Sequence, residues 1–182
     1  LKITTADGNV TTREYDDLNR KITITKPDNN REIVYQDRKG QKIKRVLEKG
    51  MENLTYHYQY DGFGNLIKTI DAKNQEMGYV YNNNGQLIET RYPDSAGKVY
   101  DQHSSALTEF NYYDTKGNLT KTTDRKGQII YYDYNEYNQV IKQDLPTSPN
   151  KDYYYNKIGQ LKKLSKGNEF EKFFSYDARG QL

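Results

Sequence analysis

A seven-residue pattern that begins with Tyr-Asp or Tyr-Asn recurs along the chain and constrains its fold more than any other feature. Its clearest copy reads Tyr60-Asp61-Gly62-Phe63-Gly64-Asn65-Leu66. Further copies begin at Tyr81, Tyr113, Tyr134, Tyr155 and Tyr176, and weaker copies begin at Tyr15 and Tyr35. The positions of Tyr60 and Tyr81 differ by 21, as do the last three pairs of neighbouring copies, whereas those of Tyr81 and Tyr113 differ by 32. Such a short unit buries a face only by stacking on its neighbours.

Each repeat contains a second turn signal, offset from the first. Asp71 stands ten positions after Asp61, and Asp124, which begins Asp-Arg-Lys-Gly, stands ten positions after Asp114. A turn therefore occurs about every 10 residues, twice per repeat, and turns at this spacing are typical of successive short antiparallel strands.

The residues of the turn predict its backbone geometry. An Asp or Asn side chain at the first position can accept a hydrogen bond from the backbone two residues on. A Gly or Asn three residues later can adopt the left-handed conformation. Together they predict a type I turn followed by a G1 bulge. We expect Gly117→Val to be destabilising, because a β-branched residue resists that conformation.

Tyrosines alternate along the segments that precede these turns. Residues two apart lie on one face of a strand. The pairs or triplets are Tyr56, Tyr58 and Tyr60; Tyr79 and Tyr81; Tyr132 and Tyr134; Tyr153 and Tyr155; Phe174 and Tyr176. Hairpins stacked in register are expected to align these rings as an aromatic ladder, in which each cross-strand pair contributes about 0.2–1 kcal/mol.

Composition excludes several classes of protein. The 182 residues include 19 tyrosines and 13 glycines but no cysteine and only 2 histidines, with a net charge of +3. This excludes a disulfide scaffold, a thiolate metal site, a cysteine nucleophile and a multi-histidine metal site. No apolar run is long enough to span a bilayer. The chain begins at Leu1 without an initiator Met, so we expect a fragment of a longer protein.

These patterns predict an all-β chain. We expect about eight hairpin repeats in one continuous, twisted antiparallel sheet, with residues 1–182 as a single repeat segment. Residues 92–111 interrupt the period and are expected to form a longer hairpin or a protruding loop.

The repeat resembles the YD-repeat, or Rhs-repeat, family over at least residues 15–182. The resemblance implies a sheet that spirals into a hollow shell, as in bacterial Rhs and polymorphic toxins, wall-associated proteins, insecticidal toxin-complex subunits and teneurins. The residues of the pattern are expected to be structural: Tyr60, Asp61, Gly64, Leu66, Tyr81, Gly85, Leu87, Tyr113, Asp114, Gly117, Leu119, Tyr134, Tyr155, Gly159, Leu161, Tyr176, Asp177 and Gly180.

The chain departs from the toxin members in one respect. Those members often close the shell with an aspartyl autoprotease region around an Asp-Pro-Xaa-Gly motif, and this sequence contains no Asp-Pro dipeptide. We therefore expect neither the self-cleavage module nor a toxin domain within these residues.

Candidate catalytic and metal-binding residues are few. His57 lies in an alternating segment, on the face opposite Tyr56 and Tyr58, and reads as a surface or packing side chain. His103 lies close to Asp101, Ser104 and Ser105, but neighbours in one loop rarely form a working triad. Calcium needs several converging oxygen ligands, and lysine or arginine often stands beside the turn Asp. We expect no enzymatic activity, metal or cofactor.

Two function classes remain open. The first is a non-enzymatic shell segment of a secreted or wall-associated bacterial protein, whose partners are the rest of the shell and an enclosed C-terminal toxin polypeptide. The alternative is a cell-surface module for a glycan or receptor that uses an exposed tyrosine row, with Tyr132 and Tyr153 as candidate binding residues. The basic stretch Lys39–Lys49 lacks a nucleic-acid motif and is expected to keep strands soluble.

Overall fold

The computed structural model describes residues 2–4, 10–99 and 107–182. Within these ranges the chain forms β-strands and turns and no α-helix, so no helix there could cross a membrane. It divides into two compact units, Leu1–Gln102 and His103–Leu182. The expectation of an all-β fold is confirmed.

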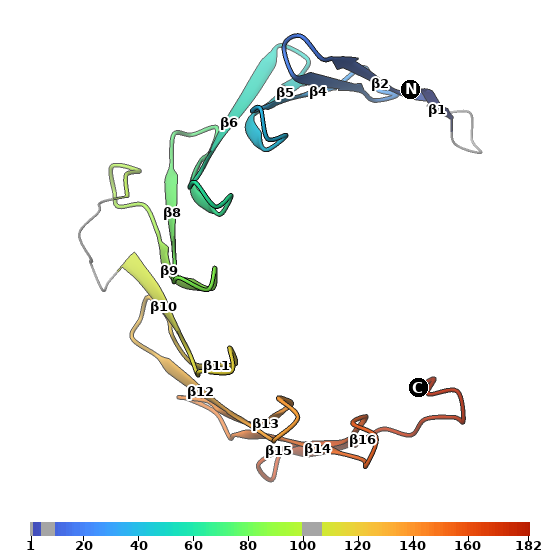
Figure 1. The fold of residues 1–182 in the computed structure, drawn as a ribbon, viewed down its shortest axis with the longest axis vertical. Coiled ribbons are helices and arrows are strands. Elements are labelled where there is room, and N and C mark those ends of the chain that lie inside the picture. Colours follow the sequence, from blue (N-terminus) through green and yellow to red (C-terminus); the bar gives the residue numbers. More distant parts are fainter. Residues whose placement is uncertain (1, 5–9, 100–106) are drawn as a thin grey trace. The chain divides into compact units, whose positions relative to one another are not determined.

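The described residues of the first unit form nine strands, each paired antiparallel with its neighbour along the chain (Figure 1). They are β1 (Lys2–Thr4), β2 (Val10–Asp16), β3 (Lys21–Thr25), β4 (Arg31–Gln36), β5 (Lys42–Lys49), β6 (Glu52–Tyr60), β7 (Leu66–Ile70), β8 (Glu76–Tyr81) and β9 (Leu87–Arg91). One repeat therefore corresponds to two strands and two turns.

The second unit follows the same rule with seven strands. They are β10 (Thr108–Tyr113), β11 (Leu119–Thr123), β12 (Ile129–Tyr134), β13 (Val140–Asp144), β14 (Lys151–Tyr155), β15 (Leu161–Lys166) and β16 (Phe170–Phe173). In both units strand order equals chain order, which is the antiparallel hairpin arrangement that the turn spacing predicts.

Each sheet is a thin wall rather than one layer of a packed core. Among the described residues, Ile33 (8% exposed) is the only buried apolar side chain, and no large side chain is completely buried. Tyrosine, threonine and lysine stems cover the strands instead, which their strand propensity and amphipathic shape allow. Both faces of the sheet therefore remain partly accessible.

The expected aromatic ladder is interrupted. Tyr58 lies opposite Thr69, and Thr69 lies opposite Met77 on the next strand. Likewise, Tyr132 lies opposite Gln143. The reason is that one repeat spans two strands, so the tyrosine-rich strands alternate with strands that carry Thr, Lys and Leu.

The irregular connection after β9 differs from a free loop. Asp94–Lys98 forms a tight turn that lies against the start of β8, where the Glu76 N–H donates to the Gly97 carbonyl at 2.9 Å. The Glu76 carboxylate contacts Lys68 Nζ at 2.6 Å and Lys98 Nζ at 3.0 Å. Residues 108–111 belong to β10. Residues 100–106 of the expected insertion lie outside the described residues.

Glu76 itself is buried, and its charge is stabilised. The hydrogen bond from Lys68, followed by that from Lys98, outweighs the effect of burial and lowers the pKa of Glu76 to about 2. An ionised carboxylate therefore fixes the Asp94–Lys98 turn against the sheet.

Candidate functional site

Seven five-residue turns at one end of the hairpins share one geometry, and we call them the tyrosine-side turns. They span residues 37–41, 61–65, 82–86, 114–118, 135–139, 156–160 and 177–181. In each, the first N–H donates to the fifth carbonyl and the fourth N–H donates to the first carbonyl, as in Asp61 to Asn65 (3.0 Å) and Gly64 to Asp61 (3.2 Å). Gly64 has a φ of 96°. This hydrogen-bond pair agrees with the expected type I turn and G1 bulge.

The first side chain of each turn holds its backbone. Asp61 Oδ1 accepts from the Phe63 and Asn65 N–H groups, both at 2.9 Å. Asn156 Oδ1 does the same for Ile158 and Gln160. At Asp61 and Asp114 these bonds favour the ionised form and lower the pKa of the carboxyl, and the Asn65 side-chain amide contributes most to lowering the pKa of Asp61.

The tyrosine before five of these turns bonds one hairpin back along the chain. Tyr81 Oη donates to the Leu66 carbonyl at 3.0 Å. Equivalent bonds are Tyr60 to Lys42 (3.0 Å), Tyr134 to Leu119 (2.8 Å), Tyr155 to Val140 (2.8 Å) and Tyr176 to Leu161 (3.0 Å). Burial is the first cause of the raised pKa of the Tyr81, Tyr134 and Tyr155 phenols. These bonds require tyrosine rather than phenylalanine, and sequence reasoning did not identify them.

Side chains also connect one turn to the next. Gln41 Nε2 donates to the Gly64 carbonyl at 3.2 Å, and Gln139 Nε2 donates to the Gly159 carbonyl at 2.7 Å. Lys39 Nζ donates to the Gly62 carbonyl at 3.1 Å. Consecutive turns are therefore in side-chain contact, and Figure 1 draws those after β6 and β8 as hooks bent to one side of the first sheet.

A β-bulge follows each of six tyrosine-side turns. In the hairpin of β6 and β7, Gln59 lies opposite Lys68 and Tyr60 lies opposite Leu66, so Ile67 is the extra residue. The equivalent extra residues are Ile43, Ile88, Thr120, Ile141 and Lys162. Sequence reasoning missed this second bulge, although isoleucine recurs at that position in four repeats.

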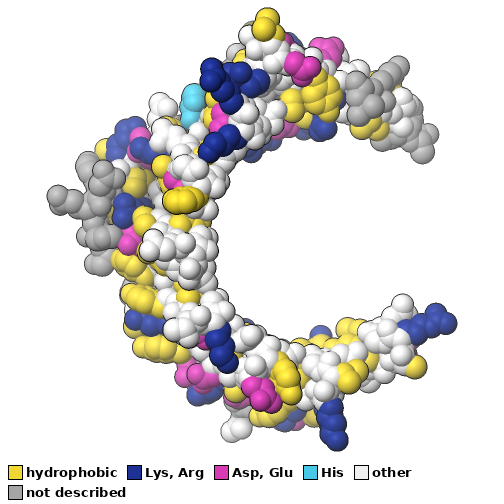
Figure 2. All heavy atoms as spheres, viewed as in Figure 1, with side chains coloured by type: hydrophobic (Ala, Val, Ile, Leu, Met, Phe, Trp, Pro, Cys, Tyr) yellow, Lys and Arg dark blue, Asp and Glu magenta, His cyan; other side chains and the backbone are white. Residues whose placement is uncertain are grey.

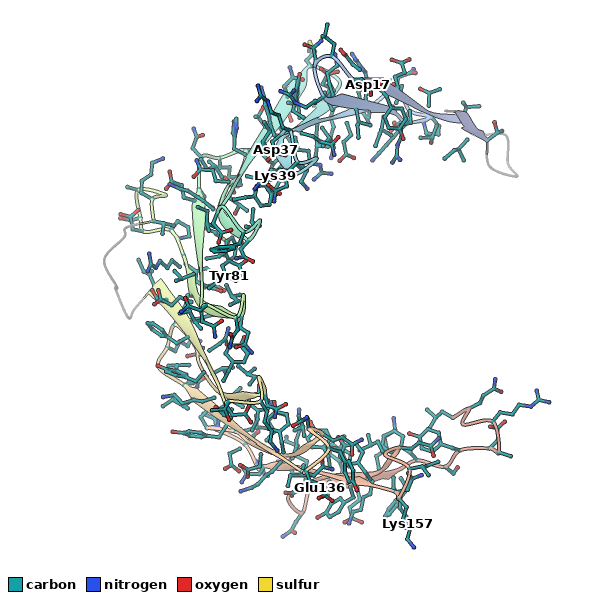
Figure 3. The ribbon with its side chains drawn as sticks, in the orientation of Figure 1. Asp17, Asp37, Lys39, Tyr81, Glu136 and Lys157 are labelled. Atoms are coloured by element: carbon teal, nitrogen blue, oxygen red, sulfur yellow. The ribbon has the colours of Figure 1, made fainter. Side chains whose placement is uncertain are left out.

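Between consecutive turns lie grooves, which we call notches and name after the side chain at the turn tip. The Tyr137 notch, of about 930 Å³, is lined by Tyr137, Ile141 and Tyr153 and by Ile158 of the next turn. The Phe63 notch has a volume of about 580 Å³, and the neighbouring Lys39 notch about 460 Å³. Figure 3 shows Lys39, Glu136 and Lys157 at the ends of their hairpins.

The expected glycan residues lie on neighbouring hairpins but are half-buried. Tyr132 pairs with Gln143, and the Tyr153 hydroxyl contacts Gln143 Oε1 at 3.4 Å. Tyr153 also lines the Tyr137 notch. Tyr131 and Tyr154, which alternate with them along the strands, are each 49% exposed. Along β12 and β14, the more accessible tyrosines are thus on the opposite face.

The remaining candidate residues are the two histidines and the basic stretch Lys39–Lys49. His57 is exposed on β6 between Lys44 and Ile70 on the adjacent strands, and His103 lies outside the described residues. In the stretch Lys39–Lys49, Arg45 Nε contacts Glu32 Oε1 at 2.6 Å and Lys42 Nζ lies 4.3 Å from the centre of the Tyr58 ring. No group of three or more potential metal ligands occurs within the described ranges. Figure 2 shows basic, acidic and apolar side chains interspersed.

This chain is similar in sequence and in fold to several known proteins. The model of the RHS Repeat family matches residues 1–31. A double-stranded DNA deaminase toxin A from Burkholderia cenocepacia (strain H111) is 27% identical over 177 residues, which are 93% of this chain and 11% of that protein. The crystal structures of TcdB2-TccC3-TEV and TcdB2-TccC3-Cdc42 match the whole chain with TM-scores of 0.66 and 0.67 at 15% identity, over 12% of their own length.

Proposed function

We propose that this chain is a non-enzymatic wall segment of a shell that encloses a polypeptide cargo in a bacterial toxin-delivery or wall-associated protein. The proposal is supported by the match of residues 1–31 to the RHS Repeat model and by the similarity to the toxin proteins named above. The chain covers about a tenth of the relatives that it matches. A segment of that size supplies part of a wall, and the activity named for the deaminase toxin is a property of that whole protein.

The observation that carries the proposal is the single-layer sheet. A sheet with one buried apolar side chain in the described ranges lacks the second layer that closes an ordinary domain. Successive hairpins of this sheet are held together by hydrogen bonds, such as those from the Tyr81, Tyr134 and Tyr155 hydroxyls. A surface of this kind can grow by adding hairpins while both faces stay available, one to solvent and one to a cargo.

Limited proteolysis of the full-length parent protein, followed by mass spectrometry, tests the enclosure. We expect a C-terminal polypeptide to resist protease until the repeats unfold. Gly64→Val should shorten that protection because it disturbs a turn in the wall, whereas Gly62→Val, at an open position in the same turn, should preserve it. Immediate digestion of the C-terminal part while the repeats persist would contradict the proposal.

A second candidate, contact with a surface glycan, is supported by tyrosines in groove-like surroundings. Tyr137 and Tyr153 line one notch together with the amide side chains of Asn135 and Gln139. Aromatic rings and amides are suitable sugar contacts. A glycan-array signal that is lost on Tyr132→Ala and Tyr153→Ala, with the circular dichroism spectrum unchanged, would favour this candidate, and absence of binding to every array member would eliminate it.

A further inference from the structure

One five-residue sequence occurs twice in the chain, in turns of different surroundings. Asp-Arg-Lys-Gly-Gln spans residues 37–41, which form a tyrosine-side turn, and residues 124–128, which form the turn between β11 and β12 at the other end of the hairpins. Of the pairs of adjacent basic residues in the described ranges, only Arg38-Lys39 and Arg125-Lys126 have both members exposed. Exposed turn tips are the preferred places for proteolytic cleavage, so a protease that cleaves after basic residues meets the same peptide twice.

Within the turn, the two copies are held by the same hydrogen bonds. In both, the first N–H donates to the fifth carbonyl and the fourth N–H donates to the first carbonyl. Asp37 Oδ1 and Asp124 Oδ1 each accept from the third and fifth N–H groups of their own turn, at 2.8–2.9 Å. Gly40 has a φ of 80° and Gly127 a φ of 76°. The turns themselves therefore resist opening to a similar extent.

The first copy is also bonded to its surroundings. Lys39 Nζ donates to the Gly62 carbonyl of the next turn at 3.1 Å. Gln41 Nε2 donates to the Gly64 carbonyl of the same turn at 3.2 Å. From β4, Gln36 Nε2 donates to a carbonyl of the first copy at 2.7 Å. These three bonds have to break before this copy can leave the sheet and enter the active site of a protease.

The second copy lacks the corresponding bonds from its lysine and its last glutamine. The side chains of Lys126 and Gln128 make no hydrogen bond or ion pair with another residue of the described ranges. The strands that flank this copy, β11 and β12, pair at three positions, whereas β4 and β5 pair at six around the first copy. Local opening therefore requires less free energy at residues 124–128 than at residues 37–41.

A cut in the second copy would leave the two strands beside it in place. β11 remains paired with β10, and β12 remains paired with β13. Across the junction of β11 and β12, Tyr134 Oη donates to the Leu119 carbonyl at 2.8 Å. Asn118 Nδ2 donates to Asn138 Oδ1 at 2.9 Å across the same junction. These bonds and the three residue pairs hold the junction without the peptide link of the turn.

We propose that the Lys126–Gly127 peptide bond is a processing site for a protease that cleaves after basic residues. Water adds across this bond, so that Lys126 gains the new carboxylate and Gly127 gains the new amino group. The products stay together as one sheet, and the junction of β11 and β12 becomes the place where that sheet separates first on denaturation. This inference goes beyond the proposed function, since it concerns the sheet itself and requires no enclosed cargo.

Brief digestion of the full-length parent protein with a low amount of trypsin tests the site, with the new N-termini identified by mass spectrometry. We expect cleavage after Lys126 to be about ten times faster than cleavage after Lys39, because three fewer hydrogen bonds have to break. Arg125→Gln combined with Lys126→Gln should abolish the early cut. The matched control combines Arg38→Gln with Lys39→Gln, in the other copy of the same peptide, and should retain it.

A second variant tests the physical reason for the difference. Gln36→Ala combined with Gln41→Ala removes two of the three bonds that hold the first copy. Cleavage after Lys39 should then become several-fold faster, whereas cleavage after Lys126 should keep its rate. An unchanged rate after Lys39 would show that these bonds do not protect the first copy, and would overturn the argument for the second.

Gel filtration of the digest tests whether the products stay together. An early cut after Lys126, followed by elution of both products as one species that separates only in urea, would support the proposal. Equal rates after Lys39 and Lys126, no early cut at either copy, or products that separate in native buffer would overturn it. If the C-terminal part of the parent is digested at once while the cut after Lys126 occurs as expected, the enclosure fails and the processing site stands.

Discussion

The two rows of turns, at opposite ends of the same hairpins, differ in how uniform their hydrogen bonding is. All seven tyrosine-side turns share one hydrogen-bond pair, whereas the turn between β2 and β3 at the same end of the hairpins has instead a bond from the Arg20 N–H to the Asp17 carbonyl at 3.3 Å. The opposite row, which we call the far-side turns, contains four turns of this type at 26–30, 71–75, 94–98 and 124–128. It also contains the Gly50-Met51 turn, the segment 145–150 and the turn 167–169. The tyrosine-side row is thus the more uniform of the two.

The irregular connection follows from this difference. The longer interval between Tyr81 and Tyr113 places all of its additional residues between β9 and β10, in the far-side row. The tyrosine-side turns at 82–86 and 114–118 keep their geometry. The row that holds the Tyr81 and Tyr134 bonds is constrained in length by them, and the far-side row can vary.

The largest effect is expected for a β-branched residue in a left-handed position of the tyrosine-side row. Gly64→Val should lower the free energy of unfolding by about 2–3 kcal/mol, from backbone strain and from the loss of the Gln41 amide bond. Gly127→Val, with a φ of 76° and open space in the far-side row, should cost less. Urea unfolding followed by circular dichroism gives both values. Equal losses would remove the distinction between the rows.

Two further glycine variants test whether the loss of stability comes from the left-handed backbone position. Gly62→Val, at an open position of the same turn without a left-handed φ, should be nearly neutral. Gly117→Val, with a φ of 89° at the position equivalent to Gly64, should be destabilising in the second unit. Unchanged thermal stability of Gly117→Val would contradict the assigned turn geometry.

In the far-side row, the ionised side chain of Glu76 attaches the Asp94–Lys98 turn to the sheet, as the tyrosine hydroxyls attach hairpins in the other row. Glu76→Gln should cost about 1–2 kcal/mol at pH 7, because hydrogen bonds to charged groups are strong but Lys98 is half-exposed. The folded pKa, about 2, lies below the ordinary value of 4.5, so this stability is present above pH 4.5 and is lost as pH falls toward 2. Hydrogen exchange at Lys98 and Val99 across this range measures it. Equal acid sensitivity in Glu76→Gln would show that another group is responsible.

Removal of a tyrosine hydroxyl should have a smaller effect on stability, and the size of this effect should depend on which face of the sheet carries the tyrosine. Tyr134→Phe and Tyr155→Phe each remove a 2.8 Å bond to a carbonyl one hairpin back and should cost about 0.5–1.5 kcal/mol. Tyr131→Phe and Tyr154→Phe, on the more exposed face, should change stability very little. Chemical denaturation of the four variants gives the comparison, and a similar loss in all four would mean that ring packing matters rather than the bond.

The smallest expected effect is a difference in the pH dependence of stability between turns that begin with Asp and turns that begin with Asn. The pKa of Asp61 and of Asp114 is lowered by bonds to the ionised form, so their contribution is present above about pH 3.9 and declines as pH falls through the folded pKa. Asp61→Asn should leave stability at pH 7 nearly unchanged and flatten its dependence below pH 4. Asn156→Asp should introduce that dependence. Thermal melts between pH 2.5 and 7 would reveal it, and parallel curves would exclude it.

The sequence predicts the strands and the tyrosine-side turns well because both depend on local chemistry. The alternation around Tyr58 and the Asp61-to-Gly64 spacing specify a strand face and a left-handed position without knowledge of the neighbours. The bonds from Tyr81 to Leu66 and from Gln41 to Gly64 join residues 15 and 23 apart. These long-range bonds depend on how the hairpins stack. In the sequence, only the use of Tyr rather than Phe at this position indicates the tyrosine bonds.

The irregular stretch and the candidate glycan residues show the limit of local reasoning. The position of the Asp94–Lys98 turn depends on Glu76, on a different strand, and no pattern near Asp94 indicates that pairing. The exposure of Tyr153 depends on Gln143 and on the next turn. The notches need side chains from two turns at once, and a single repeat contains only half of each.

The backward bond of each tyrosine has a consequence for how such a chain changes length over evolution. Since Tyr155 bonds into the hairpin before its own, a repeat with such a tyrosine carries the group that attaches it to its predecessor. Gain or loss of one whole repeat leaves every remaining attachment with a partner. Gain or loss of a single strand would exchange the two rows of turns and break the series at that point. Duplication of whole repeats is therefore the change that this architecture accepts at least cost.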